Sequence, residues 1–212
     1  MKELYFNETK AVWNSLPQLY AERFDDISLY QNGFDFLLQH IPQQSTLLEI
    51  GCGPGNVTQY IHQQRPDLVI TATDFAENML NFAQNRFPII QFNQLDIRDL
   101  NTITETYHSI LVSFCIPYIN ANEVQQFFQV AHGKLEQNGL LYLSYVDDKH
   151  EKSGYQTNSK GQKMFFNYYE KKELVVWAQN FEVIFEETIV YPKGESIEKH
   201  IALIFRKLET SL

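Results

Sequence analysis

Three glycines alternate with other residues in the segment Gly51-Cys52-Gly53-Pro54-Gly55. An apolar run at residues 46–50 precedes this segment and predicts a short buried strand, and a helical pattern starts just after it, at Val57. Glycine has no Cβ, so this spacing lets the backbone lie against a ligand that side chains would hold away. We therefore expect a strand, a ligand-binding loop and a helix here, with an ordinary tight turn as the alternative.

Strand patterns and helix patterns alternate along most of the chain. Further strands are predicted at residues 68–73, 89–95, 110–114 and 140–146. Helical patterns lie between them; Asn56 is expected to cap one helix, and Asn122 another that ends at Asn138-Gly139. Such alternation predicts a parallel sheet with helices on both faces.

The last part of the chain departs from this alternation. Apolar residues alternate with glutamates over residues 181–186, a turn is predicted at 192–195, and residues 200–206 read as another strand. The sheet should therefore finish in an antiparallel, hairpin-like pair. A length of 212 residues fits a single domain of this α/β kind.

The charge beside the glycine loop distinguishes two classes of ligand. A dinucleotide-binding loop requires glycine at position 56, where this chain has Asn56, and Pro54 removes a backbone donor that a phosphate would use. Glu49 places a negative charge two residues before the loop. A carboxylate there disfavours the pyrophosphate of NAD and favours a ligand with positive charge, such as S-adenosylmethionine, which carries an ammonium and a sulfonium group.

Two further carboxylates follow the second and third predicted strands. Asp74 stands at a strand end, where an acid can accept both ribose hydroxyls, although it can also cap the next helix. NAD-binding proteins use an acid in the same way, so Asp74 does not separate the two ligands. Asp96 is placed to accept a hydrogen bond from an adenine amine, with Phe75 and Ile97 beside the purine. A solvated loop acid and ordinary core residues are the alternatives.

Together these segments resemble the class I S-adenosylmethionine-dependent methyltransferases of the small-molecule type. The matching signatures are LEIGCGPG at 48–55, TDFAENML at 73–80, QLDI at 94–97 and LEQNGLL at 135–141, and the resemblance extends over about residues 30–206. The family implies a Rossmann-like α/β fold with a seven-stranded, mostly parallel sheet. Its strand order is 3-2-1-4-5-7-6, strand 7 is antiparallel, and helices cover both faces, which agrees with the pattern of the tail.

The resemblance also implies roles for particular residues. Glu49 would organise the methionyl ammonium, the glycines would cradle the ligand, Asp74 would bind the ribose and Asp96 the adenine amine. The segment from Phe114 to Tyr118 would lie by the methionyl group and the methyl acceptor. The predicted cofactor-binding residues are Glu49, Gly51, Cys52, Gly53, Gly55, Asp74, Phe75, Met79, Asp96, Ile97 and Phe114.

Two segments outside the signatures are expected to shape the acceptor site of a single methyltransferase domain, 1–212. Residues 10–41 read as helical, with Pro17 and Gly33 as breaks, so residues 1–42 predict a helical N-terminal lid. Residues 146–170 form an aromatic-rich insertion on the substrate side. These aromatic residues suit a lid core as well as a substrate pocket.

The resulting hypothesis is methyl transfer from S-adenosylmethionine to an N, O or C nucleophile of a small molecule. A sulfonium is already a strong electrophile, so catalysis can consist mostly of positioning and desolvation. No catalytic residue is assigned; the candidates for a base are His150, Tyr118 and Tyr20, and a solvated loop histidine is the alternative for His150. A non-catalytic S-adenosylmethionine-binding protein and a NAD-dependent oxidoreductase are the other functions to weigh.

Composition and motifs argue against three kinds of partner: nucleic acid, a membrane and a metal ion. The formal net charge is −9, and the segment Cys115-Ile116-Pro117-Tyr118 lacks the polar first residue with which nucleic-acid amine methyltransferases hold their target, so no nucleic-acid partner is expected. No apolar run approaches a membrane span and the N-terminus has no apolar signal-like region, so we expect a soluble cytoplasmic protein. The histidines and cysteines show no metal-ligand spacing, and no metal is expected.

Overall fold

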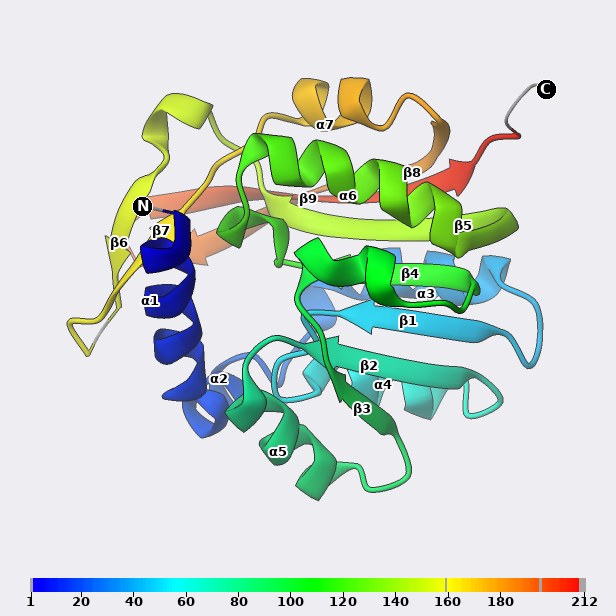
Figure 1. Cartoon of the computed structure of the whole chain (residues 1–212), viewed down its shortest axis with the longest axis horizontal. Helices are drawn as coiled ribbons and strands as arrows, with labels where there is room; N and C mark the ends of the chain where they lie inside the picture. Colours follow the sequence, from blue (N-terminus) through cyan, green and yellow to red (C-terminus); the bar gives the residue numbers. More distant parts are fainter. Residues whose placement is uncertain (1, 159, 195, 210–212) are drawn as a thin grey trace.

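The computed structural model describes residues 2–158, 160–194 and 196–209 (Figure 1). Residue 1, residue 159 of the predicted insertion, Glu195 of the predicted turn and residues 210–212 lie outside these ranges. Within them, no helix combines the length and the apolar character needed to cross a membrane.

Seven strands form one sheet in the order β3-β2-β1-β4-β5-β9-β8. The strands are β1 (Thr46–Ile50), β2 (Val69–Asp74), β3 (Gln91–Gln94), β4 (Tyr107–Ser113), β5 (Leu135–Val146), β8 (Phe181–Lys193) and β9 (Ser196–Lys207). The first five strands pair in parallel, and β9 is antiparallel to both β5 and β8. The predicted order, with an antiparallel penultimate position, is therefore confirmed.

Helices cover both faces of this sheet (Figure 1). The helical segments are α1 (Lys2–Asn14), α2 (Pro17–Arg23), η1 (Ser28–Tyr30), α3 (Gln31–His40), α4 (Asn56–Gln64), α5 (Glu77–Arg86), η2 (Ile97–Thr102), η3 (Ile116–Tyr118), α6 (Ala121–Lys134), η4 (His150–Lys152) and α7 (Lys171–Trp177). α6 and α7 bury one face of the sheet, and α3 and α4 bury the other. Along β1, Leu48 and Ile50 face α6 whereas Leu47 faces α3, as the period-two pleat requires.

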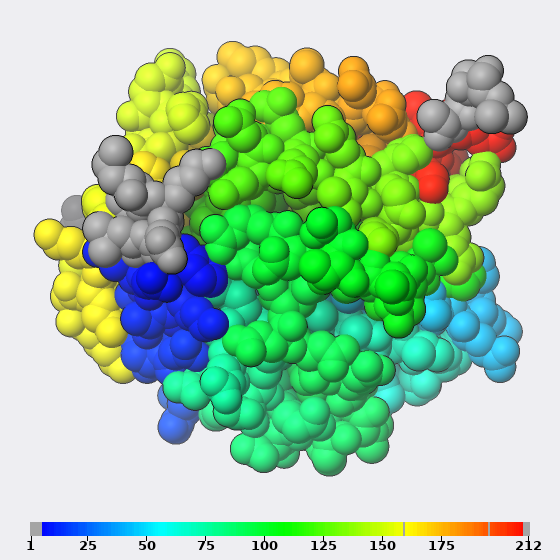
Figure 2. All heavy atoms as spheres, viewed as in Figure 1, coloured from blue at the N-terminus to red at the C-terminus, as the bar shows by residue number. Residues whose placement is uncertain are grey.

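A separate hairpin stands at the carboxyl edge of the parallel strands. It pairs β6 (Gly154–Thr157) with β7 (Lys163–Phe166) inside the predicted insertion. Figure 2 shows α1, in blue, lying against this hairpin, in yellow, and Figure 1 shows both beside the ends of the parallel strands. The two segments expected to shape an acceptor site thus lie at the edge where the glycine loop is.

Two predicted helix caps are wrong, one because of a tertiary contact and one because of a neighbouring local motif. Asn56 does not cap α4: Gly55 holds that position in the left-handed region (φ 86°), and the Asn56 amide donates to the Ala21 carbonyl instead. α6 is capped by Asn120 and not by Asn122, because Asn120 and Glu123 form a reciprocal capping box.

Two glycine predictions also fail. Gly33 lies within α3 and does not break it; a Cβ at Gly33 would lie 3.0 Å from the Tyr142 ring, so this glycine permits close packing of helix on sheet. α6 ends at Lys134, ahead of the predicted stop at Asn138-Gly139. The chain enters β5 at Leu135 directly after the helix. The pairing of β5 with β4 shifts its register between Tyr107 and Ser109.

The corrected cap yields a prediction. Asn120→Ala should lower the free energy of unfolding by about 1 kcal/mol, because two backbone N–H groups at the start of α6 lose their acceptor. Asn122→Ala, at an exposed helical position, is the matched control and should leave stability nearly unchanged. Chemical denaturation of both variants measures the difference, and a larger loss for Asn122→Ala would contradict the assigned cap.

Candidate functional site

The glycine loop joins β1 to α4 and wraps the end of β2. Gly51, Gly53 and Gly55 have φ values of 76°, 54° and 86°, in the left-handed region that other residues seldom adopt. The N–H groups of Gly51 and Cys52 donate to the Thr73 carbonyl at 2.8 and 2.9 Å. A Cβ on Gly51 would lie only 3.0 Å from Cys115, so the loop also packs tightly on the segment that follows β4.

Two carboxylates are buried at this loop. Glu49 is the penultimate residue of β1, with 2% of its surface exposed, and its Oε2 accepts a hydrogen bond from the Thr58 hydroxyl of α4 at 2.5 Å. Asp74 ends β2 with 6% exposed; its two oxygens accept the backbone N–H groups of Gly53 at 2.9 Å and Ala76 at 2.8 Å. Asp74 therefore caps the turn toward α5 and at the same time holds the glycine loop.

The electrostatics of this pair favour a cationic ligand. Burial raises the pKa of Glu49 to about 7, and the charge of Asp74 adds to this rise. Burial likewise raises the pKa of Asp74 to about 6, against the lowering effect of its backbone hydrogen bonds. Neither acid forms an ion pair with a lysine, arginine or histidine of the described residues. A ligand with positive charge would supply the missing partner.

The predicted adenine side is organised by an arginine. Both oxygens of Asp96 accept hydrogen bonds from Arg98, at 2.8 Å from Nε and 2.6 Å from Nη2, and Oδ1 also accepts the Arg98 backbone N–H. A carboxylate offers about four acceptor positions, so about one remains for an amine. The Arg98 guanidinium lies over the Phe6 ring, 4.3 Å from its centroid, and Phe6 meets Phe75 at 5.7 Å.

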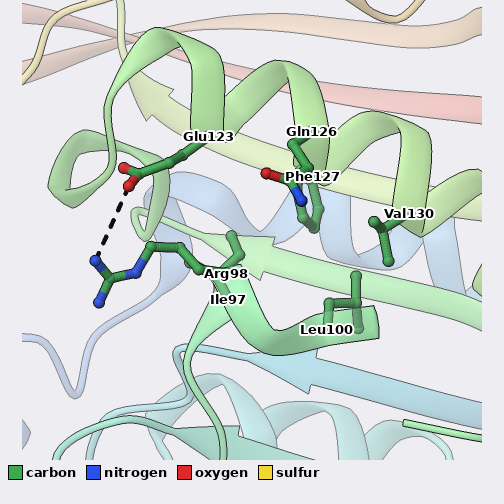
Figure 3. A pocket seen from close by; sticks show the side chains of 7 residues that line it. All are labelled: Ile97, Arg98, Leu100, Glu123, Gln126, Phe127 and Val130. Atoms are coloured by element: carbon green, nitrogen blue, oxygen red, sulfur yellow. Dashed lines mark ion pairs between the residues drawn. The ribbon is translucent and has the colours of Figure 1, made fainter. Parts of the chain in front are cut away.

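Ile97 is buried in the core behind this carboxylate. It lines a cavity of about 10 Å³ between η2 and α6, with Arg98, Leu100, Glu123, Gln126, Phe127 and Val130 (Figure 3). That volume is close to one water molecule, far too small for a purine. The cavity in Figure 3 is therefore a packing gap beside the predicted adenine site and is not the site itself.

Two other predicted residues are core residues near the loop. Met79 is buried with Val12, Leu16 and Ala76, which joins α1 to α5. Cys52 is buried in the loop, and burial raises the pKa of its thiol well above the ordinary value. Their structural role is packing, and contact with the cofactor stays a prediction for both.

The three candidate bases lie in different settings. The Tyr20 ring lies 4.0 Å from the position of a Cβ on Gly53, and burial raises the pKa of its phenol to about 12. Trp13 meets both Tyr20 and Tyr118 edge-on, with ring centroids 5.2 and 5.4 Å apart. His150 is exposed, and its Nδ1 lies 3.2 Å from the Tyr168 carbonyl. Only the two tyrosines are thus brought together beside the loop.

Sequence reasoning missed several partners. Thr58, whose hydroxyl donates to Glu49, lies in the first turn of α4. A hydroxyl side chain this close to the glycine loop could have been predicted as a hydrogen-bond partner. Arg98, the partner of Asp96, is only two residues away along the chain. Phe114 has a φ of 52°, and its ring contacts the rings of Tyr30 and His200. Tyr30 and His200 are 170 residues apart, so no local sequence pattern indicates that they are in contact. The described residues include no group of three or more His, Cys, Asp or Glu side chains arranged to hold a metal ion.

Comparisons with known proteins agree with this geometry. Residues 47–139 match the model of a family described as "Methyltransferase domain". Malonyl-[acyl-carrier protein] O-methyltransferase of Bacillus cereus is 29% identical over 142 residues, which cover 66% of this chain and 46% of that protein. Trans-aconitate 2-methyltransferase of Yersinia pestis is 40% identical over 63 residues, 29% of this chain and 24% of that protein. The chain thus spans about half or less of the length of these relatives.

Solved structures share the whole fold. The 1,6-didemethyltoxoflavin-N1-methyltransferase of Burkholderia thailandensis aligns with 99% of this chain and 91% of its own, at a TM-score of 0.75 and 15% identity. A S-adenosylmethionine-dependent methyltransferase of Clostridium acetobutylicum aligns with 93% of this chain and 100% of its own, at 0.72 and 14%. Sequence match, fold and loop geometry agree: residues 47–139 match a methyltransferase domain, and the chain has the fold of the S-adenosylmethionine-dependent methyltransferases.

Proposed function

We propose that this chain transfers a methyl group from S-adenosylmethionine to an N, O or C nucleophile of a small molecule. The observation that carries the proposal is the pair Glu49 and Asp74, buried at the glycine loop without a cation among the described residues. The ammonium and sulfonium of S-adenosylmethionine complement this pair, whereas the pyrophosphate of NAD would meet two like charges.

The residues present fit this cofactor. Glu49 would accept the methionyl ammonium, the left-handed glycines would lie against the ligand where a Cβ would collide, and Asp74 would accept the ribose hydroxyls. Asp96 and Ile97 would meet the adenine. When bound, the cofactor supplies a methyl group on an electrophilic sulfonium, so the protein is left to position the acceptor and exclude water.

Aromatic rings support a small-molecule acceptor. Tyr118 follows β4 and meets Trp13 from α1 and Phe166 from the hairpin, with centroids 5.4 and 5.7 Å apart. These rings join the predicted lid and the predicted insertion in one wall beside the loop. Such a wall suits a compact organic ligand, and the net charge of −9 opposes a nucleic-acid partner. The named relatives, which include an N-methyltransferase and an O-methyltransferase, leave the accepting atom open.

At pH 8, the Glu49→Gln substitution should raise the free energy of unfolding and lower the affinity for the cofactor product. The folded-state pKa of Glu49, about 7, lies above its ordinary 4.5, so its contribution to stability is present below about pH 4.5 and lost as the pH rises through about 7. At pH 8 the variant should therefore be more stable than the wild type, on the order of 1–3 kcal/mol, with a difference that narrows at pH 5.5. Its affinity for S-adenosylhomocysteine should fall at least about tenfold.

Thermal unfolding and calorimetric titration at both pH values measure these effects. Glu182→Gln, an exposed glutamate on the edge strand β8, is the matched control and should change neither quantity. Full affinity in Glu49→Gln would contradict the assigned ammonium site.

The cofactor class is tested by thermal unfolding with S-adenosylhomocysteine against NADH. At about 100 times its dissociation constant, a ligand adds ~2.7 kcal/mol, roughly 5–11 °C for a domain of this size. We expect this shift with S-adenosylhomocysteine only, and its loss in Asp74→Ala but not in the exposed Asp99→Ala. A shift with NADH alone would reject the proposal. Cofactor binding without turnover of any N, O or C acceptor would indicate a non-catalytic binding protein.

A further inference from the structure

A tyrosine, a histidine and a glutamate are linked at the carboxyl edge of the sheet, beside the proposed methyl-transfer site. His200 lies on β9 opposite Val146, the last residue of β5, and is 5% exposed. Its Nδ1 is 2.8 Å from the hydroxyl of Tyr30 in η1, and its Nε2 is 3.4 Å from Glu198 Oε2. No sequence motif contains these three residues.

The glycine loop reaches this group through the end of β4. Cys115 packs against Gly51, and the neighbouring Phe114 has a left-handed backbone (φ 52°), which is strained for a phenylalanine. In this conformation its ring lies 5.2 Å from the Tyr30 ring and 4.9 Å from His200. The half-buried Tyr30 hydroxyl is thus one side chain away from the segment expected to lie by the methionyl group.

The partners of His200 fix its hydrogen atoms. The other oxygen of Glu198 is paired with the ammonium of Lys193, so this side chain serves as an acceptor on both sides. Nε2 must then carry the proton that faces Glu198, which leaves Nδ1 bare to accept the proton of Tyr30. The hydrogen bonds thus lead from Tyr30, at the edge of the proposed site, to the buried imidazole of His200 and on to Glu198.

The surroundings keep His200 neutral. Burial lowers its pKa, Glu198 on its own strand opposes this effect, and Lys193 from β8 adds to it. Tyr191, also from β8, stacks on the ring at 4.7 Å, and Tyr30 faces it from η1. A neutral imidazole at pH 7 is able to take up a proton.

We propose that Tyr30 is a catalytic residue that receives the acceptor's proton and that His200 positions it and takes the proton onward, so that the acceptor class is a neutral O–H or N–H acid. This inference rests on the proposed methyl transfer. The acceptor oxygen or nitrogen forms a bond to the methyl carbon while the carbon–sulfur bond breaks and its electron pair stays on sulfur. The acceptor proton passes to Tyr30 Oη as the Tyr30 proton passes to Nδ1 of His200, giving an imidazolium paired with Glu198.

The charges nearby argue against a carboxylate acceptor. A carboxylate has no proton to lose at pH 7 and would need a cation to hold it. The cations Lys193 and Arg98 are already paired, with Glu198 and Asp96 respectively, and the exposed Arg23 lies over the Phe24 ring. Glu49 and Asp74 would repel a further anion.

The first test needs no activity. In the full chain labelled with ¹⁵N-histidine, the signal of His200 is identified by its absence in His200→Gln. We expect the neutral form at pH 7 with the proton on Nε2 and Nδ1 bare. A proton on Nδ1 would overturn the proposal, because Tyr30 would then have no acceptor.

The second test uses a panel of neutral acids (phenol, catechol, 2-hydroxypyridine, benzimidazole) against benzoate and succinate, with S-adenosylhomocysteine formation as the readout. Tyr30→Phe and His200→Gln should lower kcat about 10²-fold at pH 7 without weakening S-adenosylhomocysteine binding. With catechol and phenol, the deficit of His200→Gln should shrink toward pH 10, because these acceptors then lose their proton unaided, which a merely structural role would not produce. His132→Gln, on the far end of α6, is the control.

The remaining outcomes are distinguishable. Turnover of the carboxylates alone, no turnover of the panel with cofactor binding intact, or a deficit constant with pH would each overturn the relay. Failure of the wild-type chain to bind S-adenosylhomocysteine would overturn the proposed function, and the role of the relay with it.

Discussion

Two carboxylates are held out of water at one end of the sheet without a cation beside them in the described residues. Burying an ionised group is costly unless it is paired or hydrogen-bonded, and here only neutral donors serve the two acids. The cost appears as raised pKa values at both Glu49 and Asp74. The proposed cationic ligand would complete this pair, and the loop, the strands and the covering helices hold the two carboxylates in place.

The fold places the pair at the end of the sheet where open α/β sheets bind their ligands. β1 lies between β2 and β4, so the chain leaves β1 in one direction and returns on the other side. Glu49 and Asp74 stand at the ends of the two neighbouring strands β1 and β2. The segment after β4 closes the other side through Cys115, and α1 and the β6–β7 hairpin stand over the same edge (Figure 1).

The sequence predicted what local patterns determine. The apolar patterns located every strand of the main sheet, although β5 begins five residues before its predicted start and β8 ends seven residues after its predicted end. The glutamate-alternating tail predicted the antiparallel end. Tertiary contacts explain two of the failures: Asn56 bonds the Ala21 carbonyl and does not cap α4, and Gly33 packs against Tyr142 and does not break α3. The cap of α6 was missed for a local reason, the capping box of Asn120 and Glu123. Tyr30 and His200 were out of reach, since nothing local to either residue indicates that the last strand brings them together. The proposed cofactor side of the site follows from contiguous motifs, whereas the proposed acceptor side is assembled from distant segments.

The proposed ammonium site requires that Glu49 and Asp74 become ionised when the cofactor binds. Calorimetric titration of the chain with S-adenosylhomocysteine, in two buffers of different ionisation enthalpy, counts the protons exchanged on binding. With a ligand-free pKa of about 7 at Glu49, the account predicts release of up to about one proton at pH 6.5 and a clear decline of this release by pH 8.5. Tight binding with no proton release at pH 6.5 would contradict it, because the ammonium would then not lie on the Glu49 carboxylate.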